Sequence, residues 1–412
     1  MTFTILTDTE FETFVNSQEK TSFEQSLEMA KLRQARGYDV HLLGYKDDNG
    51  QVQVAALSYF QKVAGGKKLE IYYGPVYTTA QYLEAFLEEL KAYSKTNRVL
   101  ELGIFSAEPY QLYTSEGQPM SNPDQDLLDL YEKHQFKHQS FKTGYEGNQL
   151  FWHYVKDLKD LNKQSLQKSF TKNGKATVKK AGTFGIKIRS LKKEELHLFK
   201  EITSSTSERR EYHDKSLEYY QQFYDSFGDK AEFMYATLNF QDYHDNLERD
   251  QSKLGKNIDK LKAELEINPN STKKQNQLRE LSSQFETFTT RKAEAREFIQ
   301  KYGQQDVPLA ASLFIYTPQE AVYLFSGSYT EFNRFYAPAL LQEHVMNQAI
   351  QRGIPFYNFL GITGIFDGSD GVLRFKQNFN GYIVRKMGTF TYSPNPFKQK
   401  FIHTIKKILG RY

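Results

Sequence analysis

The residues best suited to chemistry lie near the C-terminus, where glycines are dense and cations follow. Residues 361–371 contain four glycines, and Arg374, Phe375 and Lys376 come directly after them. Glycine permits close approach of the backbone to a ligand. A cation held there can bind a phosphate or carboxylate, or stabilise the oxyanion of an acyl transfer. A surface loop with an ordinary lysine would have the same pattern, so both interpretations stay open.

A second cluster, residues 203–215, combines serines and threonines with Arg209, Arg210, Tyr212 and Lys215. Adjacent arginines followed by tyrosines suit a ligand that carries phosphate. A helix with Ser/Thr caps and a solvated face would explain the segment equally well.

Standard catalytic signatures are absent from the sequence. It contains no Gly-x-Ser-x-Gly elbow, no P-loop, no Gly-x-Gly-x-x-Gly after a strand and no His-Glu-x-x-His zinc motif. The nearest match to the phosphate loop of a coenzyme A acyltransferase, residues 34–37, lacks the second glycine. We therefore expect no metal and no cofactor, and a coenzyme A-dependent N-acyltransferase is disfavoured.

Length and composition indicate where such a chain works. Its 412 residues, 39% of them hydrophobic, suffice for one large or two ordinary domains. It has no cysteine, which is typical of a cytoplasmic protein, and its N-terminus lacks the pattern of a signal peptide. The 54 Lys and Arg against 50 Asp and Glu leave a net charge of +4, so a basic surface for a partner must be local.

Two passages that could position these residues follow one pattern. Residues 69–104 and 322–362 each contain a strand, a glycine-containing turn ending in Tyr-Thr, a helix, and a strand ending in Leu-Gly-Ile. A βαβ unit is common enough for two to look alike by chance. The shared endings nevertheless favour a mixed α/β chain built from two halves, 1–150 and 151–412.

The segment 241–300 differs from the rest in having almost no strand signal. Its apolar residues recur at gaps of three, four and seven. Pro269 interrupts this pattern and reverses the chain. We expect an antiparallel pair of helices, a coiled-coil arm inserted in the second half, rather than two ordinary bundle helices, because so polar a pair has only a narrow apolar seam to bury.

Two basic segments are candidate partner surfaces. Residues 163–182 are rich in lysine and precede the basic strand 186–189; such a run is either a solvated helix face or a contact for phosphates. Residues 397–412 place Phe397, Phe401, Ile405, Ile408 and Leu409 on one helical face with lysines opposite. That helix either packs on the core or lies on a membrane surface.

Several motifs together carry a resemblance to a known family. The late sequence Leu360-Gly-Ile-x-Gly-x-Phe, followed by Gly371-Val-x-x-Phe-Lys-x-x-Phe-Asn-Gly, resembles the closing motif of the Fem family (FemABX) of aminoacyltransferases, which build the interpeptide branches of peptidoglycan. Similar elements are Phe23-x-Gln-Ser with Arg33 beyond it, the Gly74-Pro75 turn, Val178-Lys-Lys-x-Gly and Thr206-Ser-Glu. Residues 207–212 and 325–330 resemble the MurN type of streptococcal branch enzyme.

The resemblance implies two acetyltransferase-like (GNAT-like) domains with the arm inserted in the second. It implies transfer of an amino acid, L-alanine at the second position, from aminoacyl-tRNA to the branch of lipid II, after a partner enzyme has added the first residue. Lys376, next to Phe375, would then steady negative charge at the reacting centre. Arg33, Arg210, Tyr212 and Tyr329 would bind the substrate, the two arginines and Tyr212 at its pyrophosphate and muramyl peptide. The protein would be cytoplasmic, with a peripheral contact at the inner face of the plasma membrane.

The chain departs from the family pattern at three places. Arg33 stands where lysine is usual, Thr78 replaces a common aspartate, and Asn173 or Gly174 falls where an arginine is frequent. These departures bear on how the muramyl part is held. The alternative to an enzyme is a non-catalytic tRNA-binding or scaffold protein that uses the helical arm.

Overall fold

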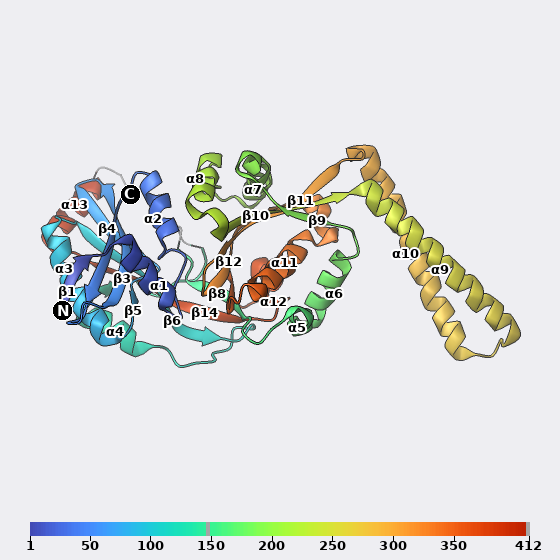
Figure 1. Cartoon of the computed structure of the whole chain (residues 1–412), viewed down its shortest axis with the longest axis horizontal. Coiled ribbons are helices and arrows are strands. Elements are labelled where there is room, and N and C mark those ends of the chain that lie inside the picture. Colours follow the sequence, from blue (N-terminus) through green and yellow to red (C-terminus); the bar gives the residue numbers. More distant parts are fainter. Residues whose placement is uncertain (146–148, 409–412) are drawn as a thin grey trace.

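The computed structural model describes residues 1–145 and 149–408, and within them the chain folds around one extended sheet (Figure 1). The strands are β1 Thr2–Ile5, β2 Asp39–Lys46, β3 Val52–Val63, β4 Gly66–Tyr72, β5 Val76–Tyr77, β6 Glu101–Tyr113, β7 Lys137–His138, β8 Trp152–Asp157, β9 Lys187–Ser190, β10 Ala231–Asn239, β11 Asp306–Tyr316, β12 Glu320–Ser328, β13 Phe356–Gly361 and β14 Tyr382–Tyr392. Their order across the sheet is β1-β2-β3-β4-β6-β14-β8-β13-β12-β11-β10-β9, with β5 paired to β3 and β7 to β14.

Helices cover this sheet and extend beyond it. They are α1 Asp8–Ser17, α2 Leu27–Ala35, α3 Ala80–Thr96, α4 Gln125–Lys133, α5 Lys163–Ser169, α6 Lys172–Ala181, α7 Leu196–Arg210, α8 Leu217–Phe227, α9 Phe240–Ile267, α10 Thr272–Tyr302, α11 Ala337–Gln351, α12 Gly371–Gln377 and α13 Pro396–Ile408. Short 3-10 turns lie at Lys193–Glu195, Gly228–Lys230 and Thr330–Phe335. The mixed α/β class expected from the sequence is confirmed.

Both βαβ units expected from the repeated pattern are present. Strand β4 pairs in parallel with β6 across helix α3, and β12 pairs in parallel with β13 across helix α11. The second pair is short, since its register covers only residues 320–322 against 356–358. Beyond that point the two strands are no longer paired with each other.

The strand β14 joins the two halves of the chain. It pairs antiparallel with β6 on one side and with β8 on the other. Because β6 belongs to the first half of the sequence and β14 to the end of the second, the sheet runs without a break from one half to the other.

The helices α9 and α10 form the antiparallel hairpin expected for residues 241–300, and it projects away from the sheet (Figure 1). The chain reverses between Ile267 and Thr272. Residues buried along its seam are Leu247, Leu254, Ile258, Leu261, Ala295 and Phe298. One polar side chain, Gln251, is buried with them and donates from Nε2 to Phe285 O at 3.0 Å and to Thr289 Oγ1 at 2.6 Å. A satisfied polar group in an apolar seam fixes the register of two helices.

The C-terminal helix α13 carries two exposed rings. Phe397 is 87% exposed and Phe401 67% exposed, while Gln399 anchors the helix to Glu101 of β6 at 2.7 Å. Leu409, expected on the same apolar face, lies outside the described residues. Among the residues described, no helix has both the length and the apolar character needed to cross a bilayer.

The glycine at position 174 is explained by a close contact between helices. A Cβ placed on Gly174, in the first turn of α6, would lie 1.9 Å from the carbonyl oxygen of Asn378, the residue that ends α12. The same carbonyl accepts a hydrogen bond from the backbone N–H of Thr171 at 3.1 Å. An arginine at position 174 would therefore separate α6 from the helix that carries Lys376.

We predict that Gly174→Ala destabilises the protein by about 2 kcal/mol or more, because the backbone of α6 or α12 must move. The matched control is Gly255→Ala in α9, whose Cβ would meet Phe285 at an ordinary 3.5 Å. That variant should gain about 0.5–1 kcal/mol from reduced freedom of the unfolded chain. Urea unfolding of both variants measures the difference, and equal stabilities would contradict the packing argument.

Candidate functional site

A cavity of about 1750 Å³ lies where the two halves of the sheet meet. Its wall includes residues of α2, β3, β4 and β6 from the first half, and of β8, β12, β13 and β14 from the second. The segment 212–215, between α7 and α8, also lines it. A space of this size accommodates a ligand larger than an ordinary metabolite.

Arg33 lies on the cavity wall and is already paired. Its Nη2 is 3.0 Å from Glu24 Oε2, and its Cζ lies 4.0 Å from the centre of the Tyr59 ring. Burial raises the pKa of the Glu24 carboxyl, and the Arg33 guanidinium offsets part of that rise. The buried Nε of Arg33 has no hydrogen-bond partner among the described residues, so one donor of the guanidinium is uncommitted.

Two further cations line the same part of the cavity. Arg36 Cζ and Lys215 Nζ lie 4.9 Å and 5.6 Å from the centre of the Tyr219 ring, and all three residues are on the wall. The sequence indicated Lys215 as part of a cluster but gave no reason to select Arg36. Together with Arg33 these cations make this wall suited to an anionic group.

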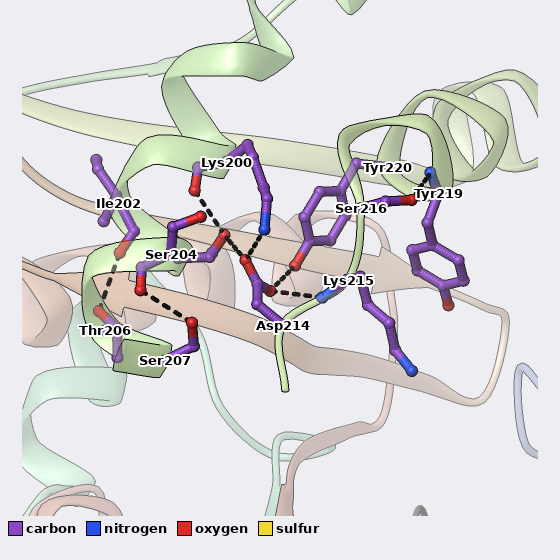
Figure 2. A network of polar contacts seen from close by, with 11 residues as sticks. Lys200, Ile202, Ser204, Thr206, Ser207, Asp214, Lys215, Ser216, Tyr219 and Tyr220 are labelled. Atoms are coloured by element: carbon purple, nitrogen blue, oxygen red, sulfur yellow. Dashed lines mark hydrogen bonds and ion pairs between the residues drawn. The ribbon is translucent and has the colours of Figure 1, made fainter. Parts of the chain in front are cut away.

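Tyr212 and Lys215 line the cavity, and Asp214, which lies between them in the chain, is held by several polar contacts. Figure 2 shows the contacts of Asp214. Asp214 Oδ2 accepts from Lys200 Nζ at 2.6 Å and from Thr203 Oγ1 at 2.9 Å, while Oδ1 accepts from Tyr220 Oη at 2.7 Å. Although burial acts to raise it, hydrogen bonds from Lys200, Tyr220 and Thr203 hold the pKa of Asp214 below its ordinary value. The carboxylate therefore ties the connecting segment to both α7 and α8.

The two candidate binding residues near Asp214 differ in position. Tyr212 is 46% exposed and lines the cavity. Arg210, the last residue of α7, is exposed and is not among the lining residues. Its binding role stays a prediction.

Lys376 lies on α12, behind the wall rather than on it. Its side chain is buried, and Nζ donates to the carbonyl oxygens of Leu360 at 3.1 Å and Gly361 at 2.5 Å. Leu360 has a φ of 56° and itself lines the cavity. Burial lowers the pKa of Lys376 to about 7, against a smaller opposing effect of Asp370. Nζ therefore holds its proton less firmly than the Nζ of an exposed lysine does.

The glycine-rich loop that precedes Lys376 is fixed by Asp370, the cap of α12. Asp370 Oδ1 accepts from the backbone of Val372 and Leu373, and Oδ2 accepts from the backbone and hydroxyl of Thr363. This carboxylate thus closes the loop onto the helix and sets the position of Lys376 relative to β13.

Phe375 and Tyr329 are half-buried and pack on the core instead of lining the cavity. The Phe375 ring meets Phe379 edge-on at 5.6 Å. Tyr329 donates from its backbone N–H to Leu309 O at 3.1 Å, and its ring lies 6.4 Å from that of Phe332. The structure thus places Arg33 and Tyr212 on one cavity, with Lys376 one residue contact away.

Sequence reasoning missed a chain of hydrogen-bonded polar residues on the cavity wall. Asn358 Nδ2 lies 2.8 Å from Glu320 Oε2 and 3.3 Å from His153 Nδ1, and His153 Nε2 lies 2.9 Å from Tyr73 Oη. All four residues line the cavity. The one signal available was an asparagine inside the apolar strand 356–361. Among the described residues, no group of three or more His, Cys, Asp or Glu could hold a metal ion.

Comparison with known proteins gives matches over the whole chain. The model of the FemAB family matches residues 6–407. Aminoacyltransferase FemA of Staphylococcus aureus, in strain bovine RF122 / ET3-1 and in strain NCTC 8325, is 30% identical over 421 residues, covering 100% of both chains. The crystal structure of FemX superimposes with a TM-score of 0.77 at 22% identity, covering 98% of this chain and 100% of that one. The similarity to FemX, at 22% identity, shows the fold alone.

The burial of Lys376 predicts a pH-dependent stability. Its pKa is about 7 in the folded protein and 10.5 when exposed, so between these values the unfolded chain binds more protons and stability rises with pH. The unfolding free energy of the wild type relative to Lys376→Met should increase by about 1.4 kcal/mol per pH unit between pH 7 and 9. Urea unfolding at several pH values measures it, with the exposed Lys95→Met as control; parallel curves for wild type and Lys376→Met would refute it.

Proposed function

The chain belongs to the FemAB family, and from that membership we propose that it transfers an aminoacyl group from aminoacyl-tRNA to an amine on the stem-peptide branch of lipid II, in peptidoglycan synthesis. Its relatives that are 30% identical over the full length are aminoacyltransferases. In more detail, we propose that the group is L-alanine and that it is added at the second position of the branch, after a partner enzyme has added the first.

The observation that carries this proposal is the buried Lys376 beside the large cavity. Aminoacyl transfer from an ester needs a positioned amine and stabilisation of the negative charge that develops on the carbonyl oxygen. The Lys376 ammonium contacts the turn at Leu360, which lines the cavity. Phe375 beside it packs on the core and so holds the short helix α12 in place.

The cationic wall supports a phosphate-bearing substrate. Arg33, Arg36 and Lys215 all lie on this wall, with Arg33 paired to Glu24. We assign the pyrophosphate and muramyl peptide of lipid II to this wall, with Tyr212 as a ring that stacks on the peptide. Arg210 and Tyr329 are proposed to bind parts of the substrates outside the cavity.

We propose two domains, residues 1–150 and 151–412, with the helical arm at 241–300 inserted in the second. The lysines of residues 163–182 or the arm are the proposed surface for tRNA.

The transfer reaction is tested by an acceptor comparison. Purified protein is mixed with radiolabelled alanyl-tRNA and with lipid II that is either unbranched or carries one serine or alanine on its lysine. We expect label on the branched acceptor alone. Label on the unbranched acceptor would make this a first-position enzyme. No transfer with alanyl-, seryl- or glycyl-tRNA would contradict the enzyme and favour the RNA-binding scaffold.

In the same assay Lys376→Met should lower turnover by about 10²–10³-fold, the usual loss when one oxyanion-stabilising group is removed. Binding of tRNA should be unchanged, and Lys95→Met serves as the control for a surface lysine. Turnover equal to that of the wild type would exclude a role for Lys376 in the reaction.

We further propose that α13 contacts the inner face of the plasma membrane through its exposed rings. Phe397 and Phe401 lie on a helix that also carries several lysines, which suits an anionic lipid surface. Replacing both rings with serine should lower co-sedimentation with anionic vesicles at least about tenfold, since burying one ring contributes about 1.5–3 kcal/mol. Ile267→Ser, at a side chain 87% exposed in the hairpin, is the matched control. Equal sedimentation of the ring variant and the wild type would exclude the contact.

A further inference from the structure

Glu320 is a carboxylate on the cavity wall that the proposed reaction leaves without a role. It is half-buried at the start of β12 and makes no ion pair within residues 1–145 and 149–408. The neighbouring cation, Lys386, donates instead to Ala107 O at 2.8 Å. Burial raises the pKa of Glu320, and Asn358 and Lys386 only partly offset the rise. Glu320 therefore has a cation in its vicinity but makes no direct ion pair among the described residues.

The hydrogen bonds around Glu320 have one consistent direction. Asn358 Oδ1 accepts from the backbone N–H of Leu360 at 2.9 Å, which orients its amide so that Nδ2 faces both Glu320 and His153. The two hydrogens of Nδ2 then serve Glu320 Oε2 and His153 Nδ1. His153 Nε2–H donates to Tyr73 Oη, whose hydroxyl donates to Leu150 O at 3.2 Å.

This direction requires a neutral imidazole at His153. Burial, assisted by Lys386 and Lys376, lowers the pKa of His153 well below its ordinary value. Within this chain of hydrogen bonds Asn358 therefore offers Glu320 a neutral donor, and the nearby Lys386 offsets part of the effect of burial without forming an ion pair with the carboxylate. The carboxylate is oriented by its neighbours but not neutralised by them.

The turn at Leu360 bonds both to Asn358, which is the hydrogen-bond partner of Glu320, and to Lys376. The peptide N–H of Leu360 bonds to Asn358, and the carbonyl oxygen of Leu360 bonds to Lys376. A ligand group at Glu320 is thereby positioned relative to Lys376 through two residues, Asn358 and Leu360. This connection makes Glu320 part of the same site.

We propose that Glu320 binds a primary ammonium group of a substrate inside the cavity. A cationic amine would supply the direct ion pair that the carboxylate lacks, in a site where water is partly excluded and a charge-assisted hydrogen bond is strong. The inference rests on the proposed function, in which two such groups reach the cavity. One is the α-ammonium of the aminoacyl ester, and the other is the acceptor amine of the branch.

Equilibrium binding tests the proposal without any reaction. One pair of probes is a muramyl pentapeptide whose lysine carries one alanine with a free α-amine, and the same branched peptide acetylated at that amine. The other pair is 3′-alanylamido-adenosine and its 3′-lactylamido counterpart, which lacks the α-amine. The wild type should bind the amine form of at least one pair about tenfold more tightly, and Glu320→Gln should bind both forms of that pair alike. The pair that responds identifies the source of the ammonium.

Two further variants separate recognition from folding. Glu320→Asp keeps the charge and should retain part of the preference, and Glu19→Gln, at an exposed lining residue, should retain all of it. If Glu320→Gln keeps the full preference, or the wild type prefers the amine in neither pair, the proposal is overturned. If the wild type prefers an amine but transfers no label, the proposed function fails while the ammonium site stands.

Discussion

The pairing of β14 with both β6 and β8 is the constraint on which the rest of this structure depends. It makes the last strand of the chain the centre of the sheet, so the edge of the first half at β6 is covered by a strand from the end of the second half. The cavity lies at this junction and takes wall residues from both sides. Neither half alone would bring Arg33 close to Tyr212, or Tyr73 close to His153.

Within that frame, the turn at the end of β13 organises the site. Leu360 adopts a positive φ, which a bulky residue accepts only when its surroundings determine it. Here its N–H is held by Asn358 and its carbonyl by Lys376. The buried lysine therefore has a structural function in the unliganded protein as well as the chemical role we propose. For Nζ to reach a substrate carbonyl, the turn at Leu360 must move, because Lys376 lies behind the cavity wall and donates to the carbonyls of Leu360 and Gly361.

Much of the fold could be predicted from the sequence because its signals are local. The repeated strand-helix-strand pattern indicated both βαβ units, and the heptad spacing with Pro269 indicated the hairpin. The central position of β14 could not be predicted, because pairing between residues 382–392 and 101–113 leaves no local pattern. The same holds for the site: Lys376 follows a recognisable glycine-rich loop, whereas Glu320, Asn358 and His153 meet only through long-range contacts. Arg33 was identified, but its pairing with Glu24 depends on burial that spacing does not reveal.

A cluster of aromatic rings joins the base of the hairpin of α9 and α10 to the body of the protein. Phe240 and Phe298 stack at 4.4 Å, and both lie within 6 Å of Phe332, in the turn that follows β12. Lys301 and Arg334 add ion pairs between α10 and this turn. The 28 residues of α9 reach about 40 Å from that base. A partner that displaced the distant tip would therefore act on the connection between β12 and α11. That connection follows the end of β12, the strand that begins with Glu320.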